Sequence, residues 1–341
     1  MRRVLTFTLL LGASFGFAQS FRTTAVNAVD VTVSDLDRSV AFYSSVLHFQ
    51  KLSEDEIAGE PLEHATGVFG ARIRTALLQL GGEHLRLTEY LAPQGRPISV
   101  DSRSNDLWFQ HIAIVVSDMD RAYQWLRDHR VQHASSGPQT LPQWNKNAGG
   151  IKAFYFRDPD NHNLEIIYFP PGKGDPKWQR TTASIFMGID HTAIAVADTE
   201  RSLAFYRDLL GFHVAGSSEN YGTEQEHLNN VFGARLRITS LRAMSGPGVE
   251  LLEYLAPRTG RSIPDDLHAN DIAHWETEIL TTNVRDAFAS LAKTSHPLIS
   301  SDVEPLTFSD ETREEFLAKD PDGHVVSLMS PQRIVTAGRQ P

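Results

Sequence analysis

The chain has 341 residues, which is too long for one ordinary domain and sufficient for two. Hydrophobic residues make up 41% of it, as in an ordinary globular protein, and its formal net charge of −10 argues against nucleic acid as a partner, because a phosphate backbone is bound through Lys and Arg. The sequence contains no cysteine, which excludes thiolate metal sites, cysteine nucleophiles and disulfides.

Residues 1–18 have the pattern of a secretory signal peptide. Arg2 and Arg3 precede an apolar stretch that runs to Phe17, and Ala18 places a small residue at the expected cleavage point. The stretch is shorter than the roughly 20 apolar residues that span a bilayer, so a signal is favoured over a membrane anchor. The pattern predicts export to the periplasm or the medium, and no later segment is apolar enough to span a membrane.

After the signal, one pattern occurs four times: an apolar strand, a helix of similar length, and further strands ending in an apolar run. The first and third copies match closely, since DLDRSVAFYSSVLHF recurs as DTERSLAFYRDLLGF and VFGARIR recurs as VFGARLR. A long-period repeat indicates one supersecondary unit that buries its face against another copy. The four modules occupy residues 24–93, 105–170, 185–257 and 270–331.

In chain order, these modules predict a first domain at residues 24–170 and a second at residues 185–331. Residues 171–184 are rich in Gly, Pro and polar side chains, which is typical of a linker. Residues 332–341 are expected to form a loose tail.

Local signals support this division. An aspartate precedes the helical pattern in three modules, and Asp35, Asp118 and Asp198 suit the first turn of a helix, where carboxylates meet the helix dipole. The tetrads DPDN and DPDG each join two strands, so their carboxylates are predicted to form turns rather than to bind metal.

Polar side chains in apolar strands single out modules two and three. His111 and His191 open apolar first strands, and Glu165 and Glu250 lie within apolar last strands. Burying one carboxylate without a partner is costly, so a lone Glu would favour a solvent-facing edge. Two such Glu residues, each with a His in its own module, favour metal ligation. Two imidazoles and two carboxylates suit a divalent ion such as Ni, Zn, Fe, Co or Mn, without choosing among them.

Modules one and four lack a complete set of this kind. The equivalent positions hold Ala28 and Arg86 in module one, and Glu276 and Ser327 in module four. His274 lies two residues before Glu276, on the same face of the predicted strand, and could act as a further ligand.

The first strands, the AFY-x-x-x-L-x-F helices and the DPD turns resemble the vicinal oxygen chelate superfamily, which includes glyoxalase I, type I extradiol dioxygenases, and fosfomycin and bleomycin resistance proteins. The resemblance covers roughly residues 24–330. It implies an α+β fold in which four βαβββ modules pair into two cupped mixed sheets. It also implies that each module of a functional pair contributes one ligand from its first strand and one from its last.

Two pairings of the modules stay open. Pairing two with three, and one with four, brings together a complete ligand set: His111, Glu165, His191 and Glu250. Pairing one with two, and three with four, gives an alternative metal set: His191, Glu250, Glu276 and His274. In that second arrangement Arg86 would neutralise Glu165 or bind an anionic substrate.

The resemblance implies a metal-dependent enzyme of glyoxalase type that acts on a small substrate with vicinal oxygens. One divalent ion would stabilise an enediolate-like charge as a Lewis acid, and Glu165 or Glu250 would act as general base, giving lyase or isomerase chemistry. An extradiol-type dioxygenase is an alternative, which Ser327 disfavours because those enzymes carry a Glu there. A non-catalytic binding or resistance protein, with Tyr221 in a pocket-shaping loop, is another. The expected partner is a small molecule, and the expected state is a monomer or a homodimer.

Overall fold

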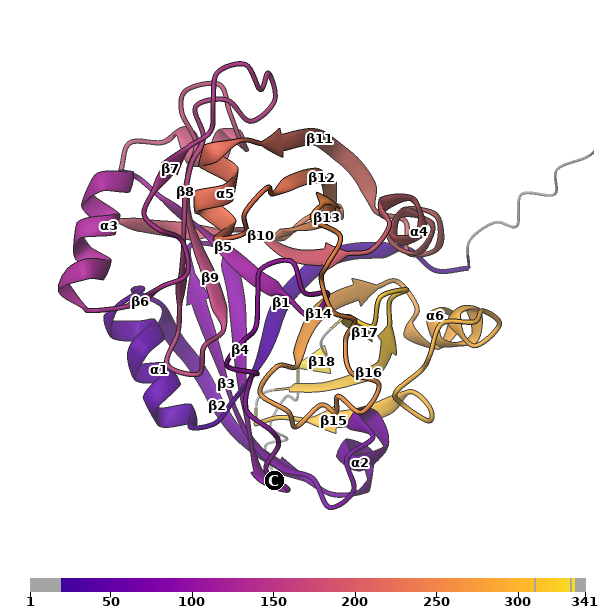
Figure 1. The fold of residues 1–341 in the computed structure, drawn as a ribbon. Coiled ribbons are helices and arrows are strands. Elements are labelled where there is room, and N and C mark those ends of the chain that lie inside the picture. Colours follow the sequence, from indigo (N-terminus) through magenta and orange to yellow (C-terminus); the bar gives the residue numbers. More distant parts are fainter. Residues whose placement is uncertain (1–19, 310, 332, 335–341) are drawn as a thin grey trace, which may run out of the picture.

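The computed structural model describes residues 20–309, 311–331 and 333–334 (Figure 1). The predicted signal peptide lies outside the described residues, as does most of the predicted tail. Among the residues described, no helix has the length and apolarity needed to cross a bilayer.

The strands form two nine-stranded mixed sheets, and each sheet combines one module from either half of the chain. The first has the order β15-β16-β17-β14-β1-β4-β3-β2, with β18 beside β16. The second has the order β11-β12-β13-β10-β5-β9-β8-β6, with β7 beside β8. Modules one and four therefore share a sheet, as do modules two and three. The chain does not adopt the pairing of one with two and three with four, so the ranges 24–170 and 185–331 each contribute to both sheets.

The strands of modules one and four are β1 (Thr23–Val33), β2 (Gln50–Ala58), β3 (Arg72–Leu80), β4 (Glu83–Ala92), β14 (Trp275–Thr281), β15 (Glu304–Thr307), β16 (Glu311–Lys319), β17 (Val325–Met329) and β18 (Arg333–Ile334). Those of modules two and three are β5 (Gln110–Val116), β6 (Gln132–His133), β7 (Gln139–Thr140), β8 (Lys152–Arg157), β9 (Asn163–Tyr168), β10 (Phe186–Val196), β11 (His213–Tyr221), β12 (Arg235–Arg242) and β13 (Gly248–Ala256).

The helices are short, and three of them begin where the sequence predicts a helix start. They are α1 (Leu36–Ser45), α2 (Glu60–Thr66), α3 (Met119–Asp128), the 3-10 helix η1 (Pro176–Gln179), α4 (Thr199–Leu203), the π-helix η2 (Ala204–Leu209), α5 (Thr223–Asn229) and α6 (Val284–Leu291). Asp35, Asp118 and Asp198 cap α1, α3 and α4. The carboxylate of each accepts a hydrogen bond of 2.9 Å from the backbone N–H of the third residue after it. The helix-start predictions are thus confirmed.

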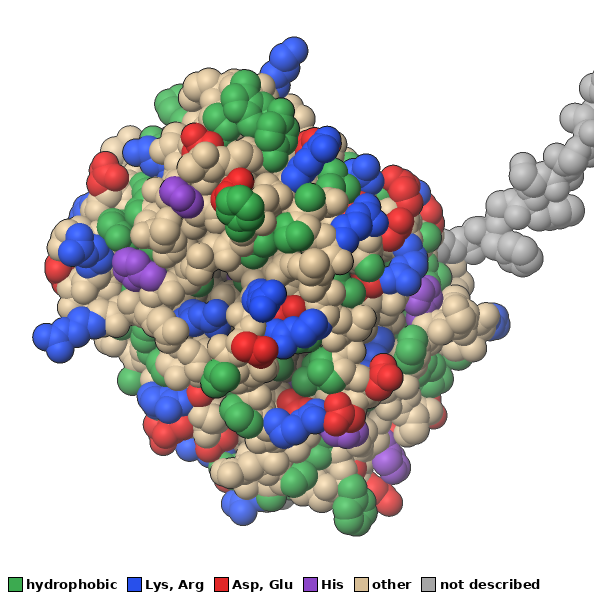
Figure 2. Space-filling model, viewed as in Figure 1, with side chains coloured by type: hydrophobic (Ala, Val, Ile, Leu, Met, Phe, Trp, Pro, Cys, Tyr) green, Lys and Arg blue, Asp and Glu red, His purple; other side chains and the backbone are tan. Residues whose placement is uncertain are grey.

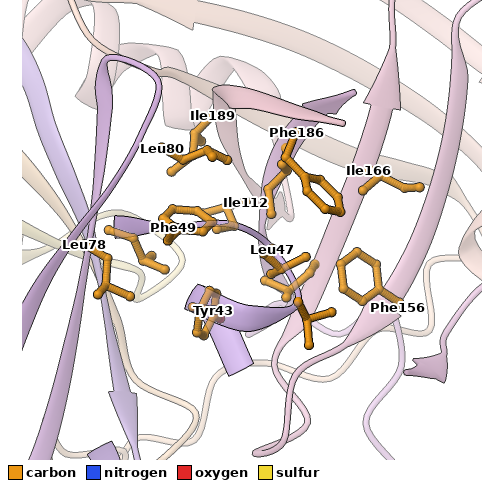
Figure 3. Close-up of a cluster of buried hydrophobic side chains, with 14 of the residues drawn as sticks. Tyr43, Leu47, Phe49, Leu78, Leu80, Ile112, Phe156, Ile166, Phe186 and Ile189 are labelled. Carbon is orange, nitrogen blue, oxygen red and sulfur yellow. The ribbon is translucent and has the colours of Figure 1, made fainter. Parts of the chain in front are cut away.

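The main apolar core lies between the two sheets, and Figure 3 shows part of it around Tyr43 of α1. It also includes residues of α3. Tyr43 of α1 and Ile112 and Ile166 of the second sheet are fully buried there. Side chains alternate along a strand, so their neighbours His111 and Glu165 point to the opposite, concave face of the sheet. Packing the convex faces together therefore directs the candidate ligands into a cup.

The sequence repeats two short motifs: Gly95-Arg96 recurs as Gly260-Arg261, and Asn105-Asp106 recurs as Asn270-Asp271. One copy of each forms a clamp between modules one and four. The backbone N–H and the guanidinium of Arg96 bond the Asp271 carboxylate, both at 2.7 Å. A Cβ at Gly95 would lie 1.9 Å from the Asn270 carbonyl oxygen, so only glycine permits this contact. The Gly-Arg and Asn-Asp motifs therefore join the two modules.

The same clamp recurs between modules three and two. Arg261 bonds the Asp106 carboxylate through its guanidinium at 2.7 Å and through its backbone N–H at 3.0 Å. A Cβ at Gly260 would lie 1.7 Å from the Asn105 carbonyl oxygen. Two copies of one motif pair thus join the modules that share a sheet.

Charges of both signs intermingle on the surface, as the face drawn in Figure 2 shows. Arg72 with Glu56, and Arg235 with Glu219, form ion pairs of 2.6 Å between an edge strand and its neighbour. Exposed pairs of this kind contribute only about 0–1 kcal/mol, so they offer controls for buried pairs.

Candidate metal centre

The antiparallel pair β5 and β10 lies at the middle of the second sheet and carries both histidines. Each histidine faces an alanine across the pair, whose small side chain leaves room for an imidazole: His111 faces Ala193 and His191 faces Ala113. The adjoining parallel strands place Glu165 beside Ala113 and Glu250 beside Ala193. All four candidate ligands therefore meet at the centre of one cup.

Their polar atoms lie close together. The Nε2 atom of His111 is 3.1 Å from Oε2 of Glu165, and Nε2 of His191 is 3.7 Å from the same oxygen. The Nε2 atom of His191 is also 3.4 Å from Oε2 of Glu250. One donor atom from each of His111, Glu165 and His191 lies within 4.8 Å of the others, a spacing that could hold a metal ion. Glu250 adjoins this trio through His191.

A cavity of about 820 Å³ opens over the cluster and is lined by all four residues. Neither Arg86 nor Tyr221 is among the described residues that line it. Arg86 belongs to the other sheet. Tyr221 is 45% exposed, stacks on Trp144 with ring centroids 4.4 Å apart, and lines a separate hollow. The structure therefore does not bring these two predicted substrate-binding residues to the cluster.

Three side chains that the sequence reasoning missed support His191. Its Nδ1 lies 2.9 Å from Oδ2 of Asp190, and the guanidinium of Arg242 donates to the same oxygen at 2.8 Å. The indole N–H of Trp178, in the predicted linker, donates to Oδ1 of Asp190 at 2.7 Å. The only sequence signal was the Asp directly before the His, because the linker composition gave no hint of a buried Trp.

The electrostatics of the cluster suit a cation. Burial disfavours a charged imidazole, but Glu250, Asp190 and Glu165 outweigh it and raise the pKa of His191 to about 9. Burial also opposes the Asp190 carboxylate, yet His191 and Arg242 hold its pKa well below the usual range. Buried carboxylates thus draw positive charge onto this site, and two imidazoles with two carboxylates are donors that a divalent first-row ion accepts. The residues present therefore fit such an ion.

The sequence profile of the Glyoxalase/Bleomycin resistance protein/Dioxygenase superfamily matches residues 25–166 and again residues 188–328. The chain belongs to this superfamily. Among its relatives, the 2-epi-5-epi-valiolone epimerase of Actinomyces sp is 33% identical over 168 residues, which are 48% of this chain and 87% of that protein. The metallothiol transferase FosB of Staphylococcus saprophyticus is 27% identical, over 42% of this chain and 75% of its own. The lactoylglutathione lyase of Arabidopsis thaliana is 24% identical, over 53% of each.

Two solved structures match over most of the chain. Glyoxalase I from Zea mays matches with a TM-score of 0.57 and 17% identity, over 91% of this chain and 92% of that one. A putative dioxygenase from Bacillus subtilis matches with a TM-score of 0.56 and 11% identity, over 91% and 86%. At these identities the likeness shows the fold alone, and the predicted α+β fold with two cupped mixed sheets is confirmed.

The second cup of this superfamily member, built from modules one and four, is filled by a buried network of charged side chains. Arg86 bonds Glu278 at 2.7 Å, and Arg313 lies 3.4 Å from Glu278 and 2.5 Å from Glu315. The ring of Phe308 lies over both guanidiniums, 5.1 and 4.5 Å from its centroid. Ion pairs and a buried aromatic ring thus occupy the interior of this cup.

The proposed alternative ligands lie in this second cup. Nε2 of His274 is 2.9 Å from Oε1 of Glu276, and Asp30 faces Glu276 across β1 and β14. This sheet does not contain His191 or Glu250, so the alternative set does not assemble. Asp30 stands where the first cup has an alanine, which the sequence comparison had not considered.

The carboxylates of the second cup predict an unusual response to pH. Burial, with help from neighbouring carboxylates, raises the pKa of Glu276 to about 8 and that of Asp30 to about 7. Burial opposes the charged form of Glu278 as well, but Arg86 and Arg313 lower its pKa to about 2. The cup therefore holds neutral and charged carboxyl groups side by side at neutral pH.

We expect the Glu276→Gln variant to lose stability less steeply than the wild type as the pH rises. Folded Glu276 keeps a proton that the unfolded chain releases above the ordinary glutamate pKa of 4.5, so the stability from this group is present below about 4.5 and lost toward about 8. Glutamine mimics the protonated form, so the variant should gain on the order of 1–3 kcal/mol relative to wild type between about pH 5 and pH 8. Urea unfolding at both pH values measures this, with exposed Glu60→Gln as control. If the free energy of unfolding changed equally with pH in the wild type and in Glu276→Gln, this expectation would be contradicted.

Proposed function

We propose that this protein is a divalent-metal-dependent isomerase or lyase that acts on a small α-hydroxycarbonyl compound, a substrate with vicinal oxygens. The observation that carries the proposal is the convergence of His111, Glu165, His191 and Glu250 on one cavity, with the first three of them buried. The ion would be one of Ni, Zn, Fe, Co or Mn, because the donor set suits all of them.

The ion, when bound, supplies Lewis acidity to two neighbouring substrate oxygens. His111 and His191 would hold it through Nε2, and the buried Glu165, which contacts both imidazoles, would balance its charge. Glu250 would act as general base, taking the proton from the carbon beside the carbonyl and returning it. Its side chain is 20% exposed compared with 6% for Glu165, and its Oε1 accepts a hydrogen bond from the Ser240 hydroxyl while Oε2 lies near His191.

Two observations favour proton transfer over oxygen chemistry. An epimerase and a lyase stand among the relatives, and epimerisation beside a carbonyl is the removal and return of a proton. Non-haem iron oxygenases use two His and one carboxylate, whereas this cup holds a second carboxylate, Glu250. Ser327 lies in the other sheet, so its identity does not bear on this cup.

The Glu250→Gln and Glu165→Gln variants test the assignment of the base. We expect Glu250→Gln to keep its ion and to lose about 10²–10⁴-fold in activity, the range contributed by a positioned acid–base group. Glu165→Gln should instead bind the ion more weakly. Exchange of the α-proton with deuterated solvent, followed by NMR over a panel of α-hydroxycarbonyl compounds, measures activity, and elemental analysis measures the ion.

An exposed control, Glu219→Gln, should match the wild type in both readouts. If Glu250→Gln exchanges the proton at the wild-type rate, Glu250 is not the base. A compound that binds tightly and is recovered unchanged would favour the binding or resistance role. Export, suggested by residues 1–18, is also a proposal, and would separate the protein from cytoplasmic glutathione. Cell fractionation tests it.

A further inference from the structure

The predicted linker folds across the mouth of the metal cup. Residues 176–179 form the 3-10 helix η1, capped by Asp175, whose carboxylate accepts a hydrogen bond from the Lys177 backbone N–H at 2.9 Å. Lys173 donates to the carbonyl oxygens of Lys146 and Asn147 at 2.5 and 3.1 Å. Asp175 and Lys177 line the cavity above the ligand cluster. The segment that joins the two halves of the chain is therefore a wall of the site.

Trp178 anchors this segment. It is only 7% exposed and belongs to the apolar cluster that contains Ala113, the residue facing His191. Lys177 lies 4.3 Å above the indole ring and 2.9 Å from Glu83 of the other sheet. Apolar packing and this ion pair hold the indole in one place, with its N–H directed at Asp190.

Asp190, held by Trp178 and Arg242, in turn orients the imidazole of His191. Its Oδ1 accepts from Trp178 and its Oδ2 accepts from Arg242, while Arg242 also bonds the Asp190 carbonyl oxygen at 2.7 Å. A carboxylate only accepts hydrogen bonds, so Nδ1 of His191 carries the proton that joins them. Nε2 is then left toward the cluster. In contrast, Nδ1 of His111 is buried without a hydrogen-bond partner among the described residues.

We infer that Trp178 is a positioning residue of the metal centre: through Asp190 it fixes the tautomer and orientation of His191, so that the site is complete only when the linker is folded over the cup. This inference rests on one part of the proposed function, the binding of a metal ion, and does not depend on the proposed reaction. Partners that orient a ligating His typically contribute 10–100-fold to metal affinity.

The Trp178→Phe variant tests the inference, since it keeps most of the apolar bulk and removes the N–H donor. We expect the full-length variant to bind Zn²⁺ about 10–100-fold more weakly than wild type in competition with a chelator. The Trp125→Phe variant is a matched control. It removes an indole N–H that donates to the Val46 carbonyl at 2.8 Å, away from the cavity, and should bind Zn²⁺ as wild type does.

A second readout needs no metal. In the metal-free wild type, the ¹⁵N-labelled imidazole of His191 should show an Nδ1-bound proton protected from exchange with solvent, and Trp178→Phe should lose that protection. If wild type binds no Zn²⁺ but the protection depends on Trp178, the positioning role holds and the proposed metal function fails.

Wild-type Zn²⁺ affinity together with an unchanged imidazole spectrum in Trp178→Phe would overturn the inference. If that variant fails to fold by circular dichroism, Asp190→Asn carries the same test, because it preserves the side-chain shape and removes the charge that accepts from Trp178, Arg242 and His191. Its Zn²⁺ affinity should fall by the same 10–100-fold. An unchanged affinity would overturn the inference equally.

Discussion

The His111→Ala variant should bind no divalent ion, whereas we expect the wild type to bind about one per chain. His111 is one of three buried groups whose donor atoms lie within 4.8 Å of one another, and alanine leaves only His191 and Glu165 in that trio. The affinity loss should exceed the 10–100-fold typical of an outer partner, and activity should fall with it. Elemental analysis of the purified variant measures the ion directly.

The second cup provides the control for this measurement. His274→Ala removes a histidine that is equally buried and also adjoins a carboxylate, Glu276, but lies in the other sheet. It should keep its ion and its activity. Loss of the ion from His274→Ala together with retention in His111→Ala would place the metal in the second cup and refute the proposed site.

The Arg86→Met variant should be destabilised by about 3–5 kcal/mol, as is usual when one partner of a buried ion pair is removed. Arg86 and Glu278 are 4% and 1% exposed and 2.7 Å apart. Methionine would leave Glu278 with Arg313 at 3.4 Å and Asn27 at 2.8 Å, which compensate its buried charge poorly. Urea or guanidinium unfolding at neutral pH measures the loss.

Two further variants test that explanation. Arg72→Met breaks the exposed pair with Glu56 and should stay within about 0.5 kcal/mol of wild type. Adding Glu278→Gln to Arg86→Met removes the stranded charge and should recover part of the loss. A cost below about 1 kcal/mol for Arg86→Met alone would mean that water reaches the network.

The sequence was sufficient for the repeat and for singling out four polar residues that the fold brings together. A carboxylate such as Glu165 or Glu250 in an apolar strand is costly unless it has a partner, and that cost is visible without coordinates. The charged network of the second cup was not predictable in the same way. In the sequence, Asp30 and Glu278 are indistinguishable from polar residues that alternate along an ordinary strand. Only the pairing of β1 with β14 brings them together.

The sequence contains the motifs that join the modules, but it does not show which motif binds which. The repeated motifs around Arg96 and Arg261 were visible, as were those around Asp106 and Asp271. A short motif does not indicate which other motif it contacts, so the pairing of the modules is known only from the contacts in the structure. Trp178 was hidden for another reason, because Gly and Pro around it indicate a linker whatever the linker packs against.

The arrangement of the sheets also orders events during synthesis. In the metal cup, β5 pairs with β10, and the hydrogen-bonded Gln110 and Thr192 are 82 residues apart in the sequence. In the other cup, β1 pairs with β14, and the hydrogen-bonded Asn27 and Glu278 are 251 residues apart. Closing the longer loop costs more chain entropy, and its contacts must wait until the end of the chain leaves the ribosome. The β1 edge that pairs with β14 is therefore exposed for most of translation, while the metal cup can close around its ligands before module four exists.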